Sequence, residues 1–163
     1  MRPIEPLPLH HSWPLYDLRE HLAPVMLDSA LARSDVALAE RGLGLWHCDL
    51  ADNTLKWTAG VYDLFGLERD SAVTRDQTVS LYAPDSREAM ERLRAYAIRH
   101  KRGFTLDVDI HQADGMGQCA MRLIAAPLLN AEQDVIGLHG VKQLLPPGAA
   151  PSRRLDPTIF VML

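Results

Sequence analysis

The chain has 163 residues, the length of about one domain, and a net charge of −4 at pH 7. Hydrophobic residues make up 47% of it and charged residues 23%, which is enough apolar mass for a core and excludes a chain disordered throughout. The net negative charge argues against a nucleic-acid binder, because such proteins hold phosphates with an excess of lysine and arginine. We also expect the chain to be too short for a sensor joined to a large enzymatic output domain.

The location of the protein is predicted from what the sequence lacks. No apolar run approaches the roughly 20 residues of a membrane helix, and the N-terminus has no apolar signal-peptide core.

Cys48 and Cys119 form no C-x-x-C pattern and are expected to be reduced, buried thiols. Adjacent His10 and His11 have no third ligand nearby in sequence, so we expect no metal. These features predict a cytoplasmic protein that binds neither membrane nor nucleic acid.

Residues 1–41 predict an N-terminal arm followed by a helical cap. Four prolines among the first 14 residues favour extended backbone. From Leu15 to Arg41 apolar residues recur at helical spacing, with Leu27, Leu31 and Leu38 on one face. We expect this amphipathic helix to pack either on the domain's own sheet or on a second subunit.

The next part of the chain predicts a strand hairpin followed by helices. In the first strand Trp46, Cys48 and Leu50 form the more apolar side, which we expect to face the core. An Asp–Asn turn joins the two strands. The predicted elements are strands over 43–50 and 55–58 and helices over 60–65, 77–82 and 84–100, the last capped by Asp85 or Ser86.

The last third predicts three strands. Phe104, Leu106, Val108 and Ile110 alternate with polar residues, as in a half-buried strand. A turn at Asp114–Gly115 leads to strands over 118–129 and 135–143. Because tight turns join antiparallel neighbours, we expect an α+β fold. It comprises a five-stranded antiparallel sheet with helices on one face, the N-terminal amphipathic helix, and a proline-rich tail over 144–163 that ends in five apolar residues.

Residues 42–143 carry a series of short motifs in a definite order. They lie in the first hairpin, in the segment LYAPDSREAM where the long helix begins, at the turn after the next strand and in the last two strands. The positions concerned are Gly44, Trp46, Asp49, Leu50, Trp57, Thr58, Tyr62, Gly66, Asp114, Gly115, Pro127, Gly137, Gly140 and Val141. In this order they resemble a PAS domain, with its G-x-W-x-x-D-L, W-[ST] and aromatic-plus-glycine pattern and its closing G-x-x-G-V. The sequence departs from the family at Ala83, Asp109 and Cys119. It also lacks the Asp-Ile-Thr motif after Gln143, which argues against direct relay to a C-terminal effector.

The resemblance implies a pocket between the sheet and the central helices. Apolar pockets with a few polar groups are the usual sites for small ligands. The alternative is a filled core, because a few large aromatic residues can close such a cavity. A ligand site should be open by roughly 300 Å³ or more. The candidate lining residues are Trp46, Cys48, Trp57, Tyr62, Phe65, Leu93, Tyr96, Phe104, Leu106, Val108, Met121 and Leu123.

The function implied by the resemblance is a sensory or signal-transduction module that binds a small ligand or a signalling protein, as a homodimer through the N-terminal helix. The ligand is unknown. Haem is not expected, because the long helix has no histidine before His100 at its end, and no segment resembles the reactive-cysteine motif of covalent flavin domains. The alternatives are a structural adaptor with a filled core and, third, a small α+β isomerase-type enzyme. Since no catalytic motif is found, we do not expect an enzyme.

Overall fold

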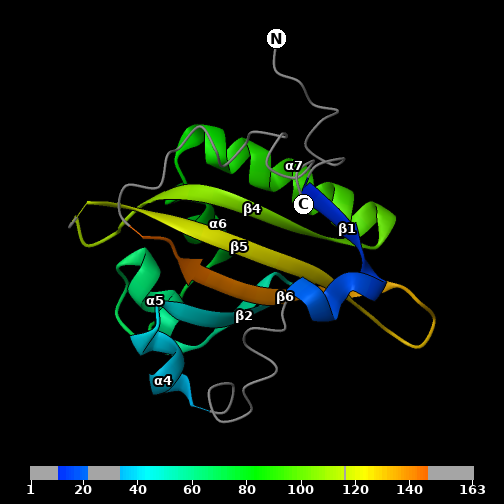
Figure 1. Ribbon diagram of the computed structural model, residues 1–163, viewed down its shortest axis with the longest axis horizontal. Coiled ribbons are helices and arrows are strands. Elements are labelled where there is room, and N and C mark those ends of the chain that lie inside the picture. Colours follow the sequence, from blue (N-terminus) through cyan, green and yellow to red (C-terminus); the bar gives the residue numbers. More distant parts are fainter. Residues whose placement is uncertain (1–10, 22–33, 116, 147–163) are drawn as a thin grey trace.

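The computed structural model describes residues 11–21, 34–115 and 117–146. These residues form a six-stranded antiparallel sheet in the order β1-β4-β5-β6-β2-β3, with helices packed against it (Figure 1). The strands are β1 (Ser12–Pro14), β2 (Leu43–Asp49), β3 (Thr54–Trp57), β4 (Arg102–His111), β5 (Gln118–Leu129) and β6 (Val135–Leu144). The helical elements are the 3₁₀ helix η1 (Leu15–Asp17) and the helices α4 (Asp35–Glu40), α5 (Ala59–Phe65), α6 (Arg75–Ser80) and α7 (Pro84–His100).

The predicted α+β class is confirmed, and the sheet has one strand more than expected. The additional strand, β1, pairs with the edge of β4 and places Trp13 opposite Gly103. The Trp13 ring lies so close to Gly103 that a Cβ there would meet it at 2.3 Å, and its Nε1 donates a hydrogen bond to Thr105 Oγ1 at 3.1 Å. The prolines of this segment concealed the strand, although an edge strand tolerates proline.

The helix predicted over 15–41 is broken within the described residues. Residues 15–17 form η1, residues 18–21 are helical, and a separate short helix, α4, precedes β2. Ser34 caps α4 by accepting a hydrogen bond from the backbone N–H of Ala37. The predicted features at 1–10, 22–33 and 147–163, which include His10, Leu27, Leu31 and the apolar C-terminal end, lie outside the described residues.

The helices after β3 follow the predicted pattern with small shifts. α5 ends at Gly66, whose φ of +67° suits glycine, and α7 has the predicted bounds. The predicted side-chain cap of α7 is wrong: Ala83 occupies the cap position, and Pro84 begins the helix with its fixed φ. Ser86 instead accepts a hydrogen bond from the backbone N–H of Asp109 at 2.9 Å, which ties α7 to β4.

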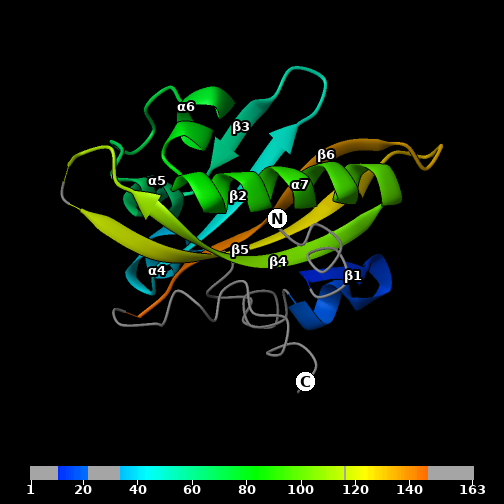
Figure 2. The same ribbon diagram turned by 90° about the horizontal axis from the view of Figure 1, so that it is seen from above.

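The main core lies between the sheet and the helices α5 and α7. Figures 1 and 2 both show α7 running alongside β4. The predicted alternation in β4 is confirmed, because Phe104, Leu106, Val108 and Ile110 are all buried while Asp107 forms an ion pair with Arg122 on the other face.

The opposite face of the sheet carries a smaller apolar cluster. Val141, on β6, is flanked by Leu45 on β2 and Ile124 on β5. Leu38 of α4 and Leu18 pack against this group, so part of the N-terminal segment covers this face. None of the described helices is long and apolar enough to cross a membrane.

Candidate functional site

The core face of β6 carries a lysine where an apolar residue would be expected. Strand pairing places Lys142 between Gly44 on β2 and Leu123 on β5. The side chain therefore points toward the helices and is only 5% exposed. A buried lysine is rare unless it is paired, because removing an ammonium group from water is costly.

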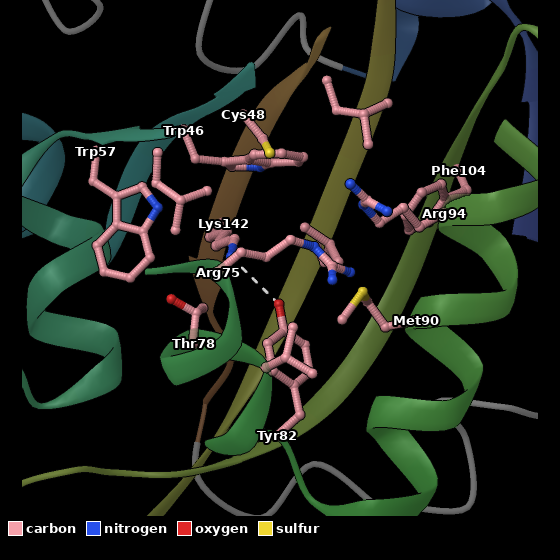
Figure 3. Close-up of a pocket in the computed structure, with 14 residues that line it drawn as sticks. Trp46, Cys48, Trp57, Arg75, Thr78, Tyr82, Met90, Arg94, Phe104 and Lys142 are labelled. Carbon is pink, nitrogen blue, oxygen red and sulfur yellow. Dashed lines mark hydrogen bonds between the residues drawn. The ribbon is translucent and has the colours of Figure 1, made fainter. Parts of the chain in front are cut away.

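Four aromatic rings surround the Lys142 ammonium nitrogen, and we call them the aromatic cage. Nζ lies 4.7 Å from the ring centroid of Phe65, 5.3 Å from Trp46, 5.7 Å from Trp57 and 5.8 Å from Tyr82. Nζ also donates a hydrogen bond to Tyr82 Oη at 3.3 Å, drawn as the dashed line in Figure 3. Aromatic faces attract cations, so the cage offsets part of the cost of burying this group.

Within the described part of the chain, no carboxylate forms an ion pair with Lys142. Burial without a counter-charge disfavours the ammonium form and lowers the pKa of Lys142 to about 7. This pKa of about 7 also includes two smaller effects, because Cys48 raises the pKa of Lys142 and the positive charge of Arg75 lowers it. At neutral pH a large fraction of Lys142 is therefore the uncharged amine.

Lys142 borders a cavity of about 60 Å³. Figure 3 shows Arg75 from α6 and Arg94 from α7 extending toward the same space, with Tyr82 and Met90 at its edge. Arg75 is paired with Glu91, and Arg94 donates a hydrogen bond to Asn53 Oδ1 at 3.3 Å. The full lining is Trp46, Cys48, Leu55, Trp57, Arg75, Thr78, Val79, Tyr82, Met90, Arg94, Phe104, Leu123, Leu138 and Lys142.

The polar groups of this lining are mostly hydrogen-bond donors. Trp46 Nε1 is buried and has no acceptor among the described residues. Burial also raises the pKa of Tyr82, which keeps its hydroxyl protonated at neutral pH. Since no aspartate or glutamate lines the cavity, a ligand that accepts hydrogen bonds or carries negative charge would satisfy groups that the protein leaves unpaired.

A wider polar groove adjoins the cavity on the outside. It measures about 480 Å³ and lies between the β2–β3 turn and the segment that leads into α6. Leu55, Trp57 and Arg75 line both the groove and the cavity.

The structure distributes the predicted lining residues over four environments. The five that line the cavity are Trp46, Cys48, Trp57, Phe104 and Leu123. The five that belong to the core without lining the cavity are Phe65, Leu93, Leu106, Val108 and Met121, and of these Phe65 is part of the aromatic cage. Tyr62 lines the outer groove, and Tyr96 lies against exposed His100 with ring centroids 4.3 Å apart. The interior is thus mostly filled, and its cavity is far smaller than the roughly 300 Å³ expected of a site for a drug-sized ligand.

The charged residues of the site were missed by sequence reasoning. Lys142 carried a usable signal, because the two-residue period of β6 places it on the same face as Leu138 and Gly140. Arg94 is four residues after Met90 and so lies on the inward side of α7. Arg75 and Tyr82 gave no such signal, because their positions depend on how α6 packs.

Other chemistry in the described residues is limited. They contain no group of three or more histidine, cysteine, aspartate or glutamate side chains that could hold a metal. Both cysteines are free, as expected; Cys48 is buried whereas Cys119 is only partly buried. Burial raises the pKa of Cys119, so its thiol stays protonated and unreactive at neutral pH.

Comparison with known proteins finds similarity in structure and none in sequence. No protein-family model and no curated protein matches the chain. A sensory box histidine kinase/response regulator from Burkholderia thailandensis superposes with a TM-score of 0.57 at 12% identity, over 78% of this chain and 91% of that one. The N-terminal domain of a Marinobacter aquaeolei diguanylate cyclase with a PAS/PAC sensor gives 0.56 at 13% identity, over 61% and 92%. A PAS domain from Colwellia psychrerythraea gives 0.55 at 16%, over 72% and 98%. The described residues therefore have the PAS fold.

Proposed function

We propose that the chain is a sensory signalling module, not an enzyme, and that it receives a small ligand in the cavity beside Lys142. Structures with the same fold carry names that place them in a histidine kinase/response regulator and in a diguanylate cyclase with a sensor. The observation that carries the proposal is the burial of Lys142 without a carboxylate partner. A buried charge is expensive when it is unpaired, and a ligand that supplies the missing partner would be bound strongly. We place this module in the cytoplasm.

The ligand is expected to be small and rich in acceptors. Its acceptor atoms would meet Lys142 Nζ, Trp46 Nε1 and the Tyr82 hydroxyl, which belong to three residues that line the cavity. A cavity of about 60 Å³ suits a carboxylate or carbonyl compound of a few heavy atoms. Binding of an anion would favour the ammonium form of Lys142 and so would take up a proton.

A thermal unfolding screen tests this proposal. The panel holds acetate, lactate, pyruvate, glyoxylate and nitrate, with neutral alcohols as negative controls. A ligand present at 100 times its Kd stabilises the native state by about 2.7 kcal/mol, which raises Tm by roughly 5 to 10 °C for a domain of this size.

Two tryptophan substitutions locate the site. Leu123→Trp fills the cavity and should abolish the stabilisation, whereas Leu144→Trp, at an exposed position of the neighbouring strand, should retain it. Circular dichroism verifies that both variants fold. Equal stabilisation in both variants would place the ligand elsewhere, and no stabilisation by any anion or carbonyl compound would favour the filled-core adaptor.

We also propose that the chain forms a homodimer through the segment that precedes β2. Tyr16 is 87% exposed and Val36 is 60% exposed, and both lie in that segment. Sedimentation velocity of a Tyr16→Glu/Val36→Glu variant should report a monomer. The matched control is Ile136→Glu, which adds a charge at an exposed apolar side chain in β6 and should stay dimeric. A double variant that remains dimeric would contradict this interface.

A further inference from the structure

Lys142 has the features of a nucleophilic amine. Its Nζ is buried, borders a cavity and lies 3.3 Å from the Tyr82 hydroxyl. Lysines become nucleophiles when they are desolvated in an apolar pocket or lie beside another cation. Here the aromatic cage supplies the apolar surroundings, and Arg75 lines the same cavity.

The same site would stabilise the product of a reaction with a carbonyl compound. Attack of an amine on a carbonyl carbon yields an iminium ion, whose positive charge stays on the nitrogen. The four rings of the aromatic cage lie at 4.7 to 5.8 Å from that nitrogen and would attract this cation as they attract the ammonium group.

A second group of donors indicates what else the carbonyl compound carries. Arg94 lines the cavity and forms no ion pair with a carboxylate of the described residues. Trp46 Nε1 has no acceptor there. A carboxylate attached to the carbonyl carbon would give Trp46 Nε1 an acceptor, would give Arg94 a counter-charge and would balance the iminium charge. The volume of about 60 Å³ limits the compound to a few heavy atoms.

We propose that Lys142 captures a small α-oxo acid as a reversible imine within the cavity. This inference rests on the proposed ligand site and adds the chemical class of the ligand and a covalent bond. With this bond, the protein would be a sensor that responds to the carbonyl group of the ligand as well as to the ligand's negative charge.

The reaction balances without an oxidant or a reductant. The neutral Nζ forms a bond to the carbonyl carbon, and the C=O electron pair moves to the oxygen, which gains a proton to give a carbinolamine. The nitrogen lone pair then closes the C=N bond while the oxygen leaves as water. Overall one amine, one carbonyl group and one proton yield one iminium ion and one water. The Tyr82 hydroxyl is placed to pass protons between nitrogen and oxygen.

Reductive trapping tests the proposal on the wild-type chain. The protein is incubated at pH 7 with glyoxylate and sodium cyanoborohydride, which adds hydride to an iminium carbon and leaves a stable carboxymethyl group. Peptide mass spectrometry then measures how much of this group is attached to each of the three lysines of the chain, Lys56, Lys101 and Lys142. Because exposed Lys56 and Lys101 are internal controls and ordinary lysines are almost wholly protonated at pH 7, we expect labelling of Lys142 to exceed theirs by about tenfold or more.

The controls separate this inference from the proposed function. Lys142→Arg keeps the charge and should lose the adduct, Tyr82→Phe should form it more slowly, and acetate should compete by occupying the carboxylate position. Equal labelling of all three lysines would overturn the imine. So would stabilisation by acetate and glyoxylate alike without an adduct at Lys142, although the ligand site itself would then stand. Neither stabilisation nor an adduct would overturn both proposals.

Discussion

At the scale of single residues, the uncompensated ammonium group of Lys142 should make the stability of the protein depend on pH. Its pKa in the folded state is about 7, below the value of about 10.4 for an unfolded chain. Between these values the unfolded state binds more protons, so the folded state loses stability as the pH falls from about 10 to 7. Below pH 7 the stability of the folded state falls no further from this cause, because Lys142 is then protonated in both the folded and the unfolded state.

Lys142→Met should therefore stabilise the protein most at or below pH 7. Methionine keeps a similar length without the charge, and the gain relative to wild type should shrink by an amount on the order of 4 kcal/mol between pH 7 and pH 10. Urea unfolding of both proteins across this range measures it. A difference in unfolding free energy that stays constant with pH would show that Lys142 is not buried as described.

A second dependence on pH lies on the opposite face of the sheet. His47 and His139 face each other across β2 and β6, and the pKa of His139 is lowered by burial and by the charge of His47. The unfolded state therefore binds more protons, so stability is lost as the pH falls below about 6.5. His139→Gln should lose less stability than wild type between pH 7 and pH 5. Exposed His111→Gln is the matched control and should behave as wild type.

At the scale of elements, the stability of helix α6 should affect the cavity, because this helix supplies part of the cavity lining. Thr74 caps this helix, accepting a hydrogen bond from the backbone N–H of Gln77 at 3.1 Å, and the helix carries Arg75 and Thr78 into the cavity lining. Thr74→Ala should cost about 1 kcal/mol of unfolding free energy and should also weaken ligand binding.

The control for this prediction is Ser80→Ala at the other end of the same helix. Its hydroxyl is exposed and donates only to the carbonyl of Gln77, so its loss should change stability by less than about 0.5 kcal/mol. Ligand binding that is unchanged in Thr74→Ala would show that α6 does not position the site.

The edge strand β1 gives a separate test of the fold. Trp13 covers Gly103 and is 6% exposed. Trp13→Ala should cost about 3 kcal/mol and should speed amide exchange along the adjacent edge of β4, while the protection of β5 and β6 is retained. Ile136→Ala, at an exposed apolar residue of β6, should leave exchange along β4 unchanged. Protected β4 amides in Trp13→Ala would contradict the role of β1.

At the scale of the whole molecule, the sequence predicts the fold better than the site. The alternation around Leu106 and the turn at Asp114–Gly115 depend on local periodicity, so β4, β5 and the hairpin between them could be predicted closely. β1 could not, because three residues that contain a proline have no period to detect. Its strand identity depends on Gly103, some 90 residues away, which leaves space for the Trp13 ring.

The site is harder to predict because it depends on non-local pairing. Trp46, Trp57 and Phe65 were predicted as lining residues of the pocket that the resemblance to a PAS domain implies, and their rings do converge on one point. What they surround is Lys142, whose inward position follows from the register of β6 between β2 and β5. Arg75 reaches the cavity only because of how α6 packs, so its position could not be predicted from the hydrophobic pattern, whereas the helical spacing of Arg94 from Met90 offered a signal that was not used.

The most direct test of the central claim is an NMR titration of the lysine Cε signals from pH 5 to pH 11. The chain has three lysines, so the signals are few, and Lys142→Met identifies the one from the cavity. Our account predicts that the Lys142 signal titrates near pH 7, well below the ordinary lysine pKa of about 10.4. If the Lys142 signal instead titrates near that ordinary pKa, Lys142 is either solvated or paired with a carboxylate, and the ligand site proposed around it does not exist.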